Sequence, residues 1–534
     1  MQIDLKVRVS NISLSDGSVL HFGPDDALLI VGPNNSGKSQ LLRDIESLSA
    51  RHMGGSYKGK VVNSISFTAP LNYDIYEYLQ NFRRYNDDHY YINGLRIHQH
   101  SIYSAFAAGS TDTYFGAASG IFVKRVSSDD RLSIVSPSPA LPEAGPQTPG
   151  QMMYDDEGLI SRVSDLFSKA FRKQLFLDYR SGSNIPIYVG TKPDIPLGAD
   201  RISNSYVNLV RSQDKLHEQG DGMKSFAGII MSTMVVKYNV TLIDEPEAFL
   251  HPPQERIIGR IISEESNGQV FCSTHSSNVV QGFLESGNKN IRVVRITRDN
   301  EINHVKEISA SEISQLWRDP VFRYSTALDA LFHDRAVLCE AESDCKFYEA
   351  LSEHVKGENY IDSHFIPCAG KASFPKFSIA LRKLGVPVTA ILDLDVLNDE
   401  GNIKRIYEAQ GGNWADISHH WRRLDAAVRK GIQPDSLDST KSKIADILNN
   451  WNSGQAPTSQ ISEILNLRKP WGFIKENGIS AFPAGDAYNT AKLLLDELAR
   501  FLFFQYPLAP LRNSSKLLVA MEISGWRAFW AIMN

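Results

Sequence analysis

The sequence has few cysteines, no long apolar run and no excess of basic residues. None of its four cysteines forms a C-x-x-C pair, which argues against a structural zinc site and against a disulfide framework. We therefore expect a protein of the reducing cytoplasm. No window of roughly 18 residues is continuously apolar, and the amino-terminal segment lacks the apolar core of a signal peptide. These absences argue against a membrane span. The cysteines are Cys272, Cys339, Cys345 and Cys368.

The chain also lacks a strong net charge that would indicate its binding partners. Its net charge of -5 over 534 residues gives no overall attraction for nucleic acid, although a local basic groove is compatible with that value. The length predicts about two to four domains. The Pro- and Gly-rich segment 136–150 is expected to be an exposed loop.

Strands and helices alternate in two separate parts of the chain. Short apolar runs followed by amphipathic segments occur before residue 325 and again from residue 330. This alternation predicts an α/β fold with parallel sheets in both parts. Residues 403–470 are predicted to be mainly helical. Residues 487–507 are predicted to form one helix that lies in the core or, less favoured, on an assembly face.

A phosphate-binding motif follows the first buried strand. The segment "GPNNSGKS" fits G-x-x-x-x-G-K-[ST], with an apolar run before it and a helical pattern after it. Backbone N–H groups and the helix N-terminus would face the phosphates, Lys38 would reach the β- and γ-phosphates, and Ser39 would help to hold Mg²⁺. The alternative is a chance Gly-rich turn. The expected ATP contacts in this segment are Gly32, Asn34, Asn35, Ser36, Gly37, Lys38, Ser39 and Gln40.

Two acidic residues end a second apolar strand. In "LIDEPEAFLHPP" (242–253), Asp244 and Glu245 come directly after the strand. Ligands of open α/β sheets bind at the carboxyl ends of strands. Asp244 is therefore expected to bind Mg²⁺, directly or through water, and Glu245 to orient or deprotonate the attacking water.

The "DEP-E-x-x-LHP" segment, followed by "STHS", resembles the ABC-type ATPase heads of the SMC, Rad50 and RecF group. The resemblance implies that His275 contacts the γ-phosphate, and that 217–229 is the signature loop. Gly222 of that loop would face a nucleotide, whereas Gly220 stands where the family usually has serine. It also implies a homodimer or higher homo-oligomer, and a helical dimerisation region inserted within about 55–210.

A second acidic cluster is predicted far from the first. Glu340 ends the apolar run of "AVLCEAESD", with Asp344 four residues on, and Asp393 and Asp395 end the run of "TAILDLD". If the two strands are parallel neighbours, all four carboxylates meet at one sheet edge, where Mg²⁺ or Mn²⁺ would relieve their repulsion. The alternative is that these acids are solvated strand ends or helix caps.

This pair of acidic elements resembles a Toprim domain, apart from Ala341, where many such domains have glycine. An ATPase head followed by a Toprim domain resembles the OLD (overcoming lysogenization defect) nucleases, a group that includes the Gabija nuclease subunit and retron-associated effectors. The resemblance implies an ATPase domain over 1–325 and a Toprim nuclease domain over 330–534 with C-terminal helices.

The same resemblance implies that two metal ions cut DNA at the Toprim site. Lys475 is the best match for the family's late lysine, with a plain surface lysine as the alternative, and Lys371 is a candidate phosphate contact. DNA would be held mainly through its phosphates. Candidate basic contacts, which as solvated helix faces have a simpler explanation, are Arg382, Lys383, Arg422, Arg423, Arg429 and Lys430.

The expected function is that of an ATP-binding, metal-dependent DNA endonuclease in anti-phage defence, with the ATPase gating the nuclease. ATP and Mg²⁺ (or Mn²⁺ at the Toprim site) are the expected cofactors. A partner protein or nucleic-acid-containing complex encoded nearby is also considered. The main alternative is a nucleotide-switched DNA-binding clamp of the SMC or RecF type with a non-cleaving Toprim-like domain. A transporter ATPase subunit is disfavoured.

Overall fold

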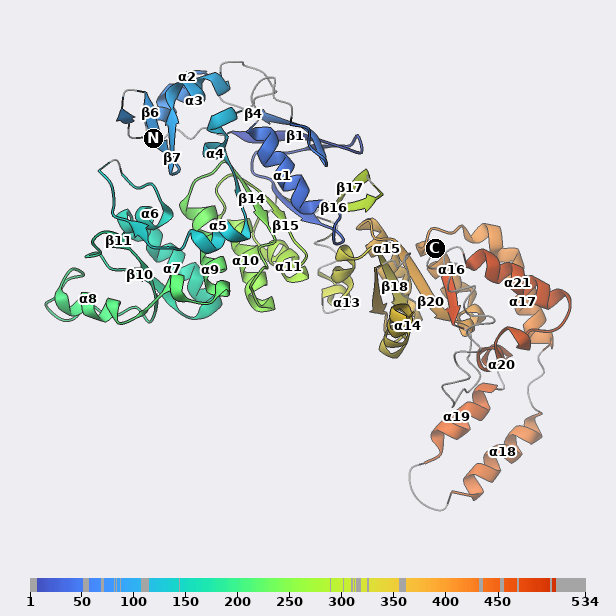
Figure 1. Cartoon of the computed structure of the whole chain (residues 1–534). Coiled ribbons are helices and arrows are strands. Elements are labelled where there is room, and N and C mark those ends of the chain that lie inside the picture. Colours follow the sequence, from blue (N-terminus) through green and yellow to red (C-terminus); the bar gives the residue numbers. More distant parts are fainter. Residues whose placement is uncertain are drawn as a thin grey trace. The chain divides into compact units, whose positions relative to one another are not determined.

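The structure is a computed structural model of the whole chain (Figure 1), which divides into two compact units, Met1–Arg323 and Tyr324–Asn534. Each unit is described by itself. The structure describes residues 7–50, 57–68, 72–80, 82, 84–86, 88–106, 115–143, 145–288, 290–300, 302–308, 311, 313, 318–323, 326–354, 362–431, 436–451, 456–467, 470–499 and 502–505.

The first unit is built on a six-stranded sheet with the order β17-β16-β3-β15-β14-β8. All neighbouring strands run parallel except β17, which pairs antiparallel with β16. Both β3 and β15 are buried at every residue, as expected for parallel strands covered on both faces. The strands are β3 (Ala27–Val31), β8 (Val123–Val126), β14 (Val240–Asp244), β15 (Gln269–Ser273), β16 (Ile291–Asp299) and β17 (Ile302–Ile308).

A second, antiparallel sheet of the first unit packs against helix α1 (Lys38–Ser49). Its order is β2-β1-β4, from β1 (Arg8–Leu14), β2 (Val19–His21) and β4 (Val62–Thr68). Helix α1 buries Leu41, Leu42, Ile45 and Leu48, which recur at helical spacing, in the core that these strands share with β3. Other helices of this unit are α9 (Asp221–Ile230), α10 (Pro252–Glu265), α11 (Ser277–Glu285) and α13 (Pro320–Arg323).

The segment 55–210 differs from the predicted helical insertion in two ways. It holds both helices and short antiparallel strands, and its strand β8 belongs to the central sheet beside β14. The sequence is rich in Tyr and Ser there, and its strands are too short for a clear period. The elements are α2 (Asn72–Gln80), β5 (Arg84–Asn86), β6 (His89–Ile92), β7 (Leu95–His98), α3 (Gln99–Phe106), α4 (Ser119–Phe122), α5 (Ser128–Ser133), β9 (Ser138–Pro139), α6 (Pro149–Asp155), α7 (Glu157–Phe171), β10 (Gln174–Leu177), β11 (Asn184–Ile185), β12 (Ile187–Gly190) and α8 (Asn204–Arg211), followed by β13 (Asp214–Lys215).

The second unit contains a four-stranded parallel sheet with the order β19-β18-β20-β21. Helices α14 (Glu342–His354) and α15 (Phe374–Lys383) connect its first strands in the alternating pattern predicted. The strands are β18 (Arg335–Cys339), β19 (Ser363–Pro367), β20 (Val388–Asp393) and β21 (Leu502–Gln505).

The predicted single helix over 487–507 is wrong at its end. Helix α21 covers Asp486–Leu498, and the aromatic stretch after it forms β21 at the edge of the sheet. Leu494, Leu495 and Leu498 are buried, so the helical part is core. The last 29 residues of the chain, 506–534, lie outside the described residues.

Helices dominate the segment between β20 and β21. Helix α17 packs against α21, while α18 and α19 lie side by side and extend away from the sheet (Figure 1). Across the described residues, no helix has both the length and the apolar character of a membrane span. The helices are α16 (Glu400–Ala409), α17 (Trp414–Gly431), α18 (Leu437–Asn449), α19 (Thr458–Leu467) and α20 (Pro470–Asn477).

Candidate nucleotide and metal sites

Three strand ends of the first unit bring the ATPase motifs together. Strand β15 lies between β3 and β14, and its Ser273 pairs with Ile30 on one side and Asp244 on the other. The phosphate loop leaves β3 and turns into α1 at Gly37, whose φ of 98° is left-handed. A Cβ at Gly37 would also lie 2.7 Å from Asn303 Nδ2, so glycine is required there.

The loop opens on a cavity of about 710 Å³. Seven of the eight predicted loop residues line it, and the eighth, Gly32, contributes a carbonyl to the loop's interior. A polar cavity of this size, edged by cations, fits a nucleoside triphosphate. The lining residues are Asn34, Asn35, Ser36, Gly37, Lys38, Ser39, Gln40, Arg43, Lys60, Val61, Glu245, His275, Arg298 and Asn303.

Lys38 and Ser36 both fit a phosphate ligand. The Lys38 Nζ donates to the carbonyls of Gly32 (2.8 Å) and Pro33 (2.7 Å), and burial lowers the pKa of Lys38 to about 8 although three nearby carboxylates oppose the shift. The Ser36 hydroxyl is buried without a hydrogen-bond partner among the residues that the structure describes. A buried hydroxyl without a hydrogen-bond partner lowers stability, and a phosphate oxygen of a bound nucleotide would supply the missing acceptor.

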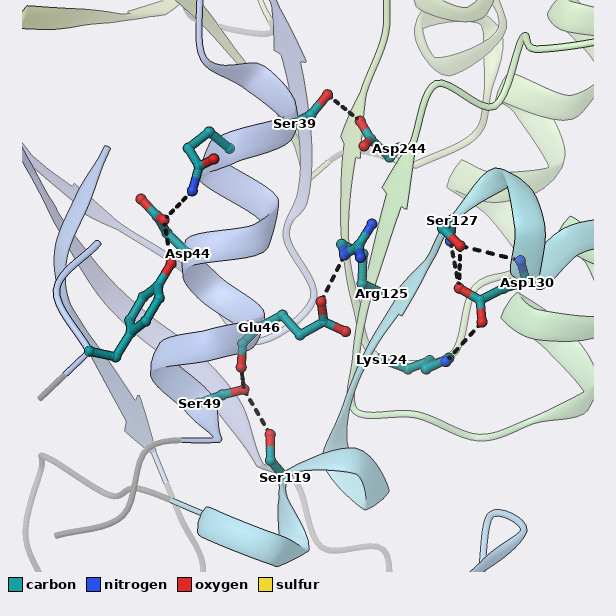
Figure 2. A network of polar contacts seen from close by, with 12 residues as sticks. Ser39, Asp44, Glu46, Ser49, Ser119, Lys124, Arg125, Ser127, Asp130 and Asp244 are labelled. Carbon is teal, nitrogen blue, oxygen red and sulfur yellow. Dashed lines mark hydrogen bonds and ion pairs between the residues drawn. The ribbon is translucent and has the colours of Figure 1, made fainter. Parts of the chain in front are cut away.

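Asp244 and Ser39 form the oxygen pair expected of a magnesium site. The Ser39 hydroxyl donates to Asp244 Oδ1 at 2.9 Å (Figure 2), and the Ser273 hydroxyl donates to the same oxygen at 2.6 Å. Carboxylate and hydroxyl oxygens at the edge of a phosphate cavity are the ligands that Mg²⁺ prefers. The two predicted metal ligands of this site therefore lie within hydrogen-bonding distance of each other.

Glu245 and His275 face each other at the same sheet edge. His275 Nε2 lies 3.6 Å from Glu245 Oε1, and both residues line the cavity. Burial lowers the pKa of His275 to about 4, with Lys38 adding to the shift, so the ring is neutral near pH 7. Glu245 adopts a left-handed φ of 47°, a strained conformation for a non-glycine residue and one that clusters at active sites.

Two further residues hold this pair, and the sequence analysis missed both. The Glu247 carboxylate accepts hydrogen bonds from the backbone N–H of His275 (2.5 Å) and from the Thr274 hydroxyl (2.9 Å), and burial raises the pKa of Glu247 to about 7. The buried Arg131 guanidinium donates from Nη1 to the Glu245 carbonyl at 2.9 Å. Glu247 is part of the quoted motif, whereas no sequence motif around Arg131 indicates a role for it.

Gly222 lies apart from the cavity of its own chain. It is in the first turn of α9, and a Cβ there would lie 2.8 Å from the Phe249 carbonyl. It is not among the described residues that line the cavity. Gly220 is the exposed N-cap of the same helix.

The second unit brings three of the four predicted Toprim carboxylates together. Strands β18 and β20 are parallel neighbours, and their ends place Glu340, Asp393 and Asp395 so that one carboxylate oxygen of each lies within 4.8 Å of the others. The Asp393 N–H donates to Glu340 Oε1 at 3.1 Å. Burial raises the pKa of Glu340, and this hydrogen bond and Lys371 oppose the shift. Such a set of half-buried oxygens suits Mg²⁺ or Mn²⁺.

Asp344 lies outside the group of three carboxylates, and one of the two candidate lysines contacts that group. Asp344 Oδ2 accepts the Ala341 N–H at 3.0 Å at the start of α14, as a helix cap would, and is outside the three-residue group. Lys371 Nζ contacts the Asp395 carboxylate and lies 3.8 Å from Glu340 Oε1. Lys475 belongs to α20, and its side chain lies outside the described residues.

The candidate DNA-contacting residues lie on exposed helix faces. Three arginines of α17 pair with acids: Arg422 with Glu400, Arg423 with Asp486, and Arg429 with Asp425. Lys383 and Lys430 are exposed. Such ion pairs are typical of solvated helix faces, so they do not identify a DNA-binding surface.

Family models match both units of the chain. Residues 192–281 match an AAA domain described as a putative AbiEii toxin of a type IV toxin–antitoxin system. Residues 331–395, which include Glu340, Asp393 and Asp395, match the Toprim domain of proteins like the overcoming lysogenization defect protein.

Individual relatives are more distant. The endonuclease GajA of Bacillus cereus is 23% identical over 204 residues, which is 33% of this chain and only 29% of GajA. An uncharacterized protein of Methanocaldococcus jannaschii, MJECL11, is 34% identical over 88 residues, 15% of this chain and 77% of that protein. Among solved structures, an Smc head bound to the winged-helix domain of ScpA matches with 14% identity and a TM-score of 0.36, over 58% of this chain and 99% of that one.

The two domain matches occur in the order predicted, an ATPase followed by an OLD-like Toprim domain. They agree with the strand ends that assemble each site in the structure. The two matched domains and their order are those of the OLD-family ATPase–Toprim nucleases, which this chain resembles.

Proposed function

We propose that this protein is an ATP-hydrolysing, metal-dependent DNA endonuclease whose ATPase domain (1–325) gates a Toprim nuclease domain (330–534). The observation that carries the proposal is the group formed by Glu340, Asp393 and Asp395 at the ends of two paired strands. Three half-buried carboxylates in one place repel each other, and divalent cations relieve that repulsion.

In the nuclease domain, Glu340, Asp393 and Asp395 would hold the divalent ions. When bound, such ions supply Lewis acidity and a water of lowered pKa for phosphodiester hydrolysis. The chain itself fixes the carboxylates, since the Asp393 N–H holds Glu340 and Asp344 holds the start of α14. Lys475 would contact the phosphate.

In the ATPase domain, Lys38 would turn from the carbonyls of its own loop to the β- and γ-phosphates. Ser39 and Asp244 would hold Mg²⁺, and Glu245 would orient the attacking water. A neutral His275 can hydrogen-bond to the γ-phosphate without adding charge. Gly222 would face the nucleotide of a second copy, which makes a homodimer the working assembly.

At the level of the cell, we assign the protein to anti-phage defence in the cytoplasm, with a partner encoded nearby. Support comes from the Toprim match and from the relative named as an endonuclease.

Plasmid cleavage tests the nuclease proposal. We expect the wild-type protein to nick or linearise plasmid DNA with Mg²⁺ or Mn²⁺ under at least one nucleotide condition. The Asp393→Asn variant should lose about 100-fold or more in activity, because loss of a partner that only supports a metal ligand already costs roughly 10- to 100-fold. The Glu408→Gln variant, which changes an exposed glutamate of α16, is the matched control and should cut normally.

Two results would count against the proposal. Equal cutting by the Asp393→Asn protein would place the activity in another site or in a contaminant. DNA binding by the wild type with a steep salt dependence, but no cutting in any condition, would favour the clamp function instead.

A further inference from the structure

The loop that follows β19 is fixed to the end of the neighbouring strand β18. The Cys368 N–H donates to the Cys339 carbonyl at 2.9 Å, and the Gly370 N–H donates to the Glu340 carbonyl at 3.1 Å. The main chain of the loop is therefore held against the same residue whose side chain belongs to the acidic group.

The backbone of this loop also has positive φ angles at two consecutive residues. Ala369 has a φ of 52° and Gly370 a φ of 109°. Left-handed alanine is sterically unfavourable, and such strain persists where the surroundings impose it. The two residues turn the chain so that Lys371 begins the short η5 turn (Lys371–Ser373) next to the carboxylates.

The Lys371 side chain completes the arrangement. Its ammonium contacts the Asp395 carboxylate and lies 3.8 Å from Glu340 Oε1, the oxygen that also accepts the Asp393 N–H. The side chain is about one-fifth exposed, so the contact is partly shielded from water. The lysine thus faces two of the three carboxylates that would hold a divalent ion.

We propose that Lys371 competes with the divalent ion for Glu340 and Asp395 and thereby sets the metal affinity of the Toprim site. An ammonium and a divalent cation cannot share these oxygens without repelling each other, so metal binding requires Lys371 to move away. This inference rests on the proposed function, because it assumes that the carboxylates bind metal.

Manganese binding to the full-length protein tests the inference. After treatment with chelator, Mn²⁺ is titrated at pH 8 and free Mn²⁺ is followed by electron paramagnetic resonance. The site of interest is the one that Asp393→Asn removes. Removing the ammonium that the divalent ion must displace from these carboxylates should tighten binding by about tenfold, so Lys371→Met should show that gain.

Two comparisons make the result specific. Lys371→Arg keeps the charge and should not show the gain, and Lys441→Met, which changes an exposed lysine of α18, should leave affinity unchanged. Lys371→Gln replaces the methionine variant if thermal unfolding shows that the latter does not fold.

The outcomes separate the two claims. If the wild type has a Mn²⁺ site that Asp393→Asn removes, but Lys371→Met binds Mn²⁺ equally or more weakly, Lys371 is only a structural tether and this inference fails alone. If the wild type has no such site, both this inference and the proposed nuclease fail.

Discussion

At the scale of residues, the ATPase site is organised by side chains that no motif assigned a role. Glu247 holds the backbone of the loop that carries His275, and Arg131 holds the backbone of Glu245. Sequence reasoning found nine of the 14 residues that line the cavity, because strand ends and the phosphate loop mark them. It could not find Arg131, since that residue acts through a contact 114 positions away.

The shifted pKa of Glu247 predicts a pH-dependent stability. In the folded protein its pKa is about 7, against 4.5 as the ordinary value, so the folded state keeps a proton that the unfolded state has lost. The stabilisation is complete below about pH 4.5 and is lost as the pH rises toward 7.

Comparison with Glu247→Gln isolates this effect, since His275 contributes the opposite trend in both proteins. The folded-state pKa of His275 is about 4, below the usual 6.5, so its contribution rises with pH. Between pH 5 and pH 7, wild-type stability should fall relative to the variant by roughly 1 to 3 kcal/mol in denaturant titrations. A constant difference would contradict the assignment.

Arg131 should affect ATP turnover more than ATP binding. Arg131→Met removes the donor to the Glu245 carbonyl, so we expect kcat to fall by about tenfold while nucleotide affinity changes little. Arg131→Lys should recover part of the rate. Ser128→Ala is the control, because it removes only the hydrogen bond of 2.8 Å that Arg131 Nη2 donates to the Ser128 hydroxyl. A loss of affinity equal to the loss of kcat would make Arg131 a purely structural residue.

At the scale of elements, the nuclease site depends on strand pairing. The predicted order of strands and helices around Glu340 and Asp393 was sufficient to place both acids, because parallel neighbours end at one edge. Asp344 illustrates the limit of this reasoning. An acid at the start of a helix serves as a cap or as a ligand with the same sequence pattern, and only its contact with the Ala341 N–H distinguishes the two here.

Strand β21 was missed because its partner is more than one hundred residues earlier. It pairs with β20 from Ala390–Leu502 to Asp393–Gln505, beside the acidic group. Successive N–H groups of this edge strand face the sheet and the solvent in turn, so proline at both Phe503 and Phe504 should break the ladder, lower the stability of the second unit by roughly 1 to 3 kcal/mol and weaken metal binding. Phe503→Val keeps the strand and serves as the control. Unchanged thermal unfolding of the proline variant would mean that β21 contributes little.

At the scale of the whole molecule, the family and the order of its domains could be predicted because each domain carries separate strand-end motifs. The mixed architecture of 55–210 could not, since most of its short strands pair within small local sheets and leave no clear period. The number of copies that assemble could not be predicted from a single chain either, because Gly222 is not among the described residues that line the cavity of its own chain.

ATP should drive assembly of two copies. With ATP and the slow-hydrolysing Glu245→Gln variant, light scattering should report the mass of two chains, because the signature residue Gly222 would complete the nucleotide site of the partner. Lys38→Ala should prevent this shift by removing the phosphate contact. A mass that does not respond to ATP in either variant would contradict nucleotide-driven assembly.

The hydrogen bond between the Asp393 N–H and Glu340 joins residues 53 positions apart. During synthesis, the residues that line one chain's nucleotide cavity, of which Asn303 is the last, emerge before the second acid of the metal site exists. Under the proposed function, a growing chain would acquire its ATP-binding residues before its metal-binding residues. A product that stops between Asn303 and Asp393 would therefore carry the ATPase domain without a complete metal site.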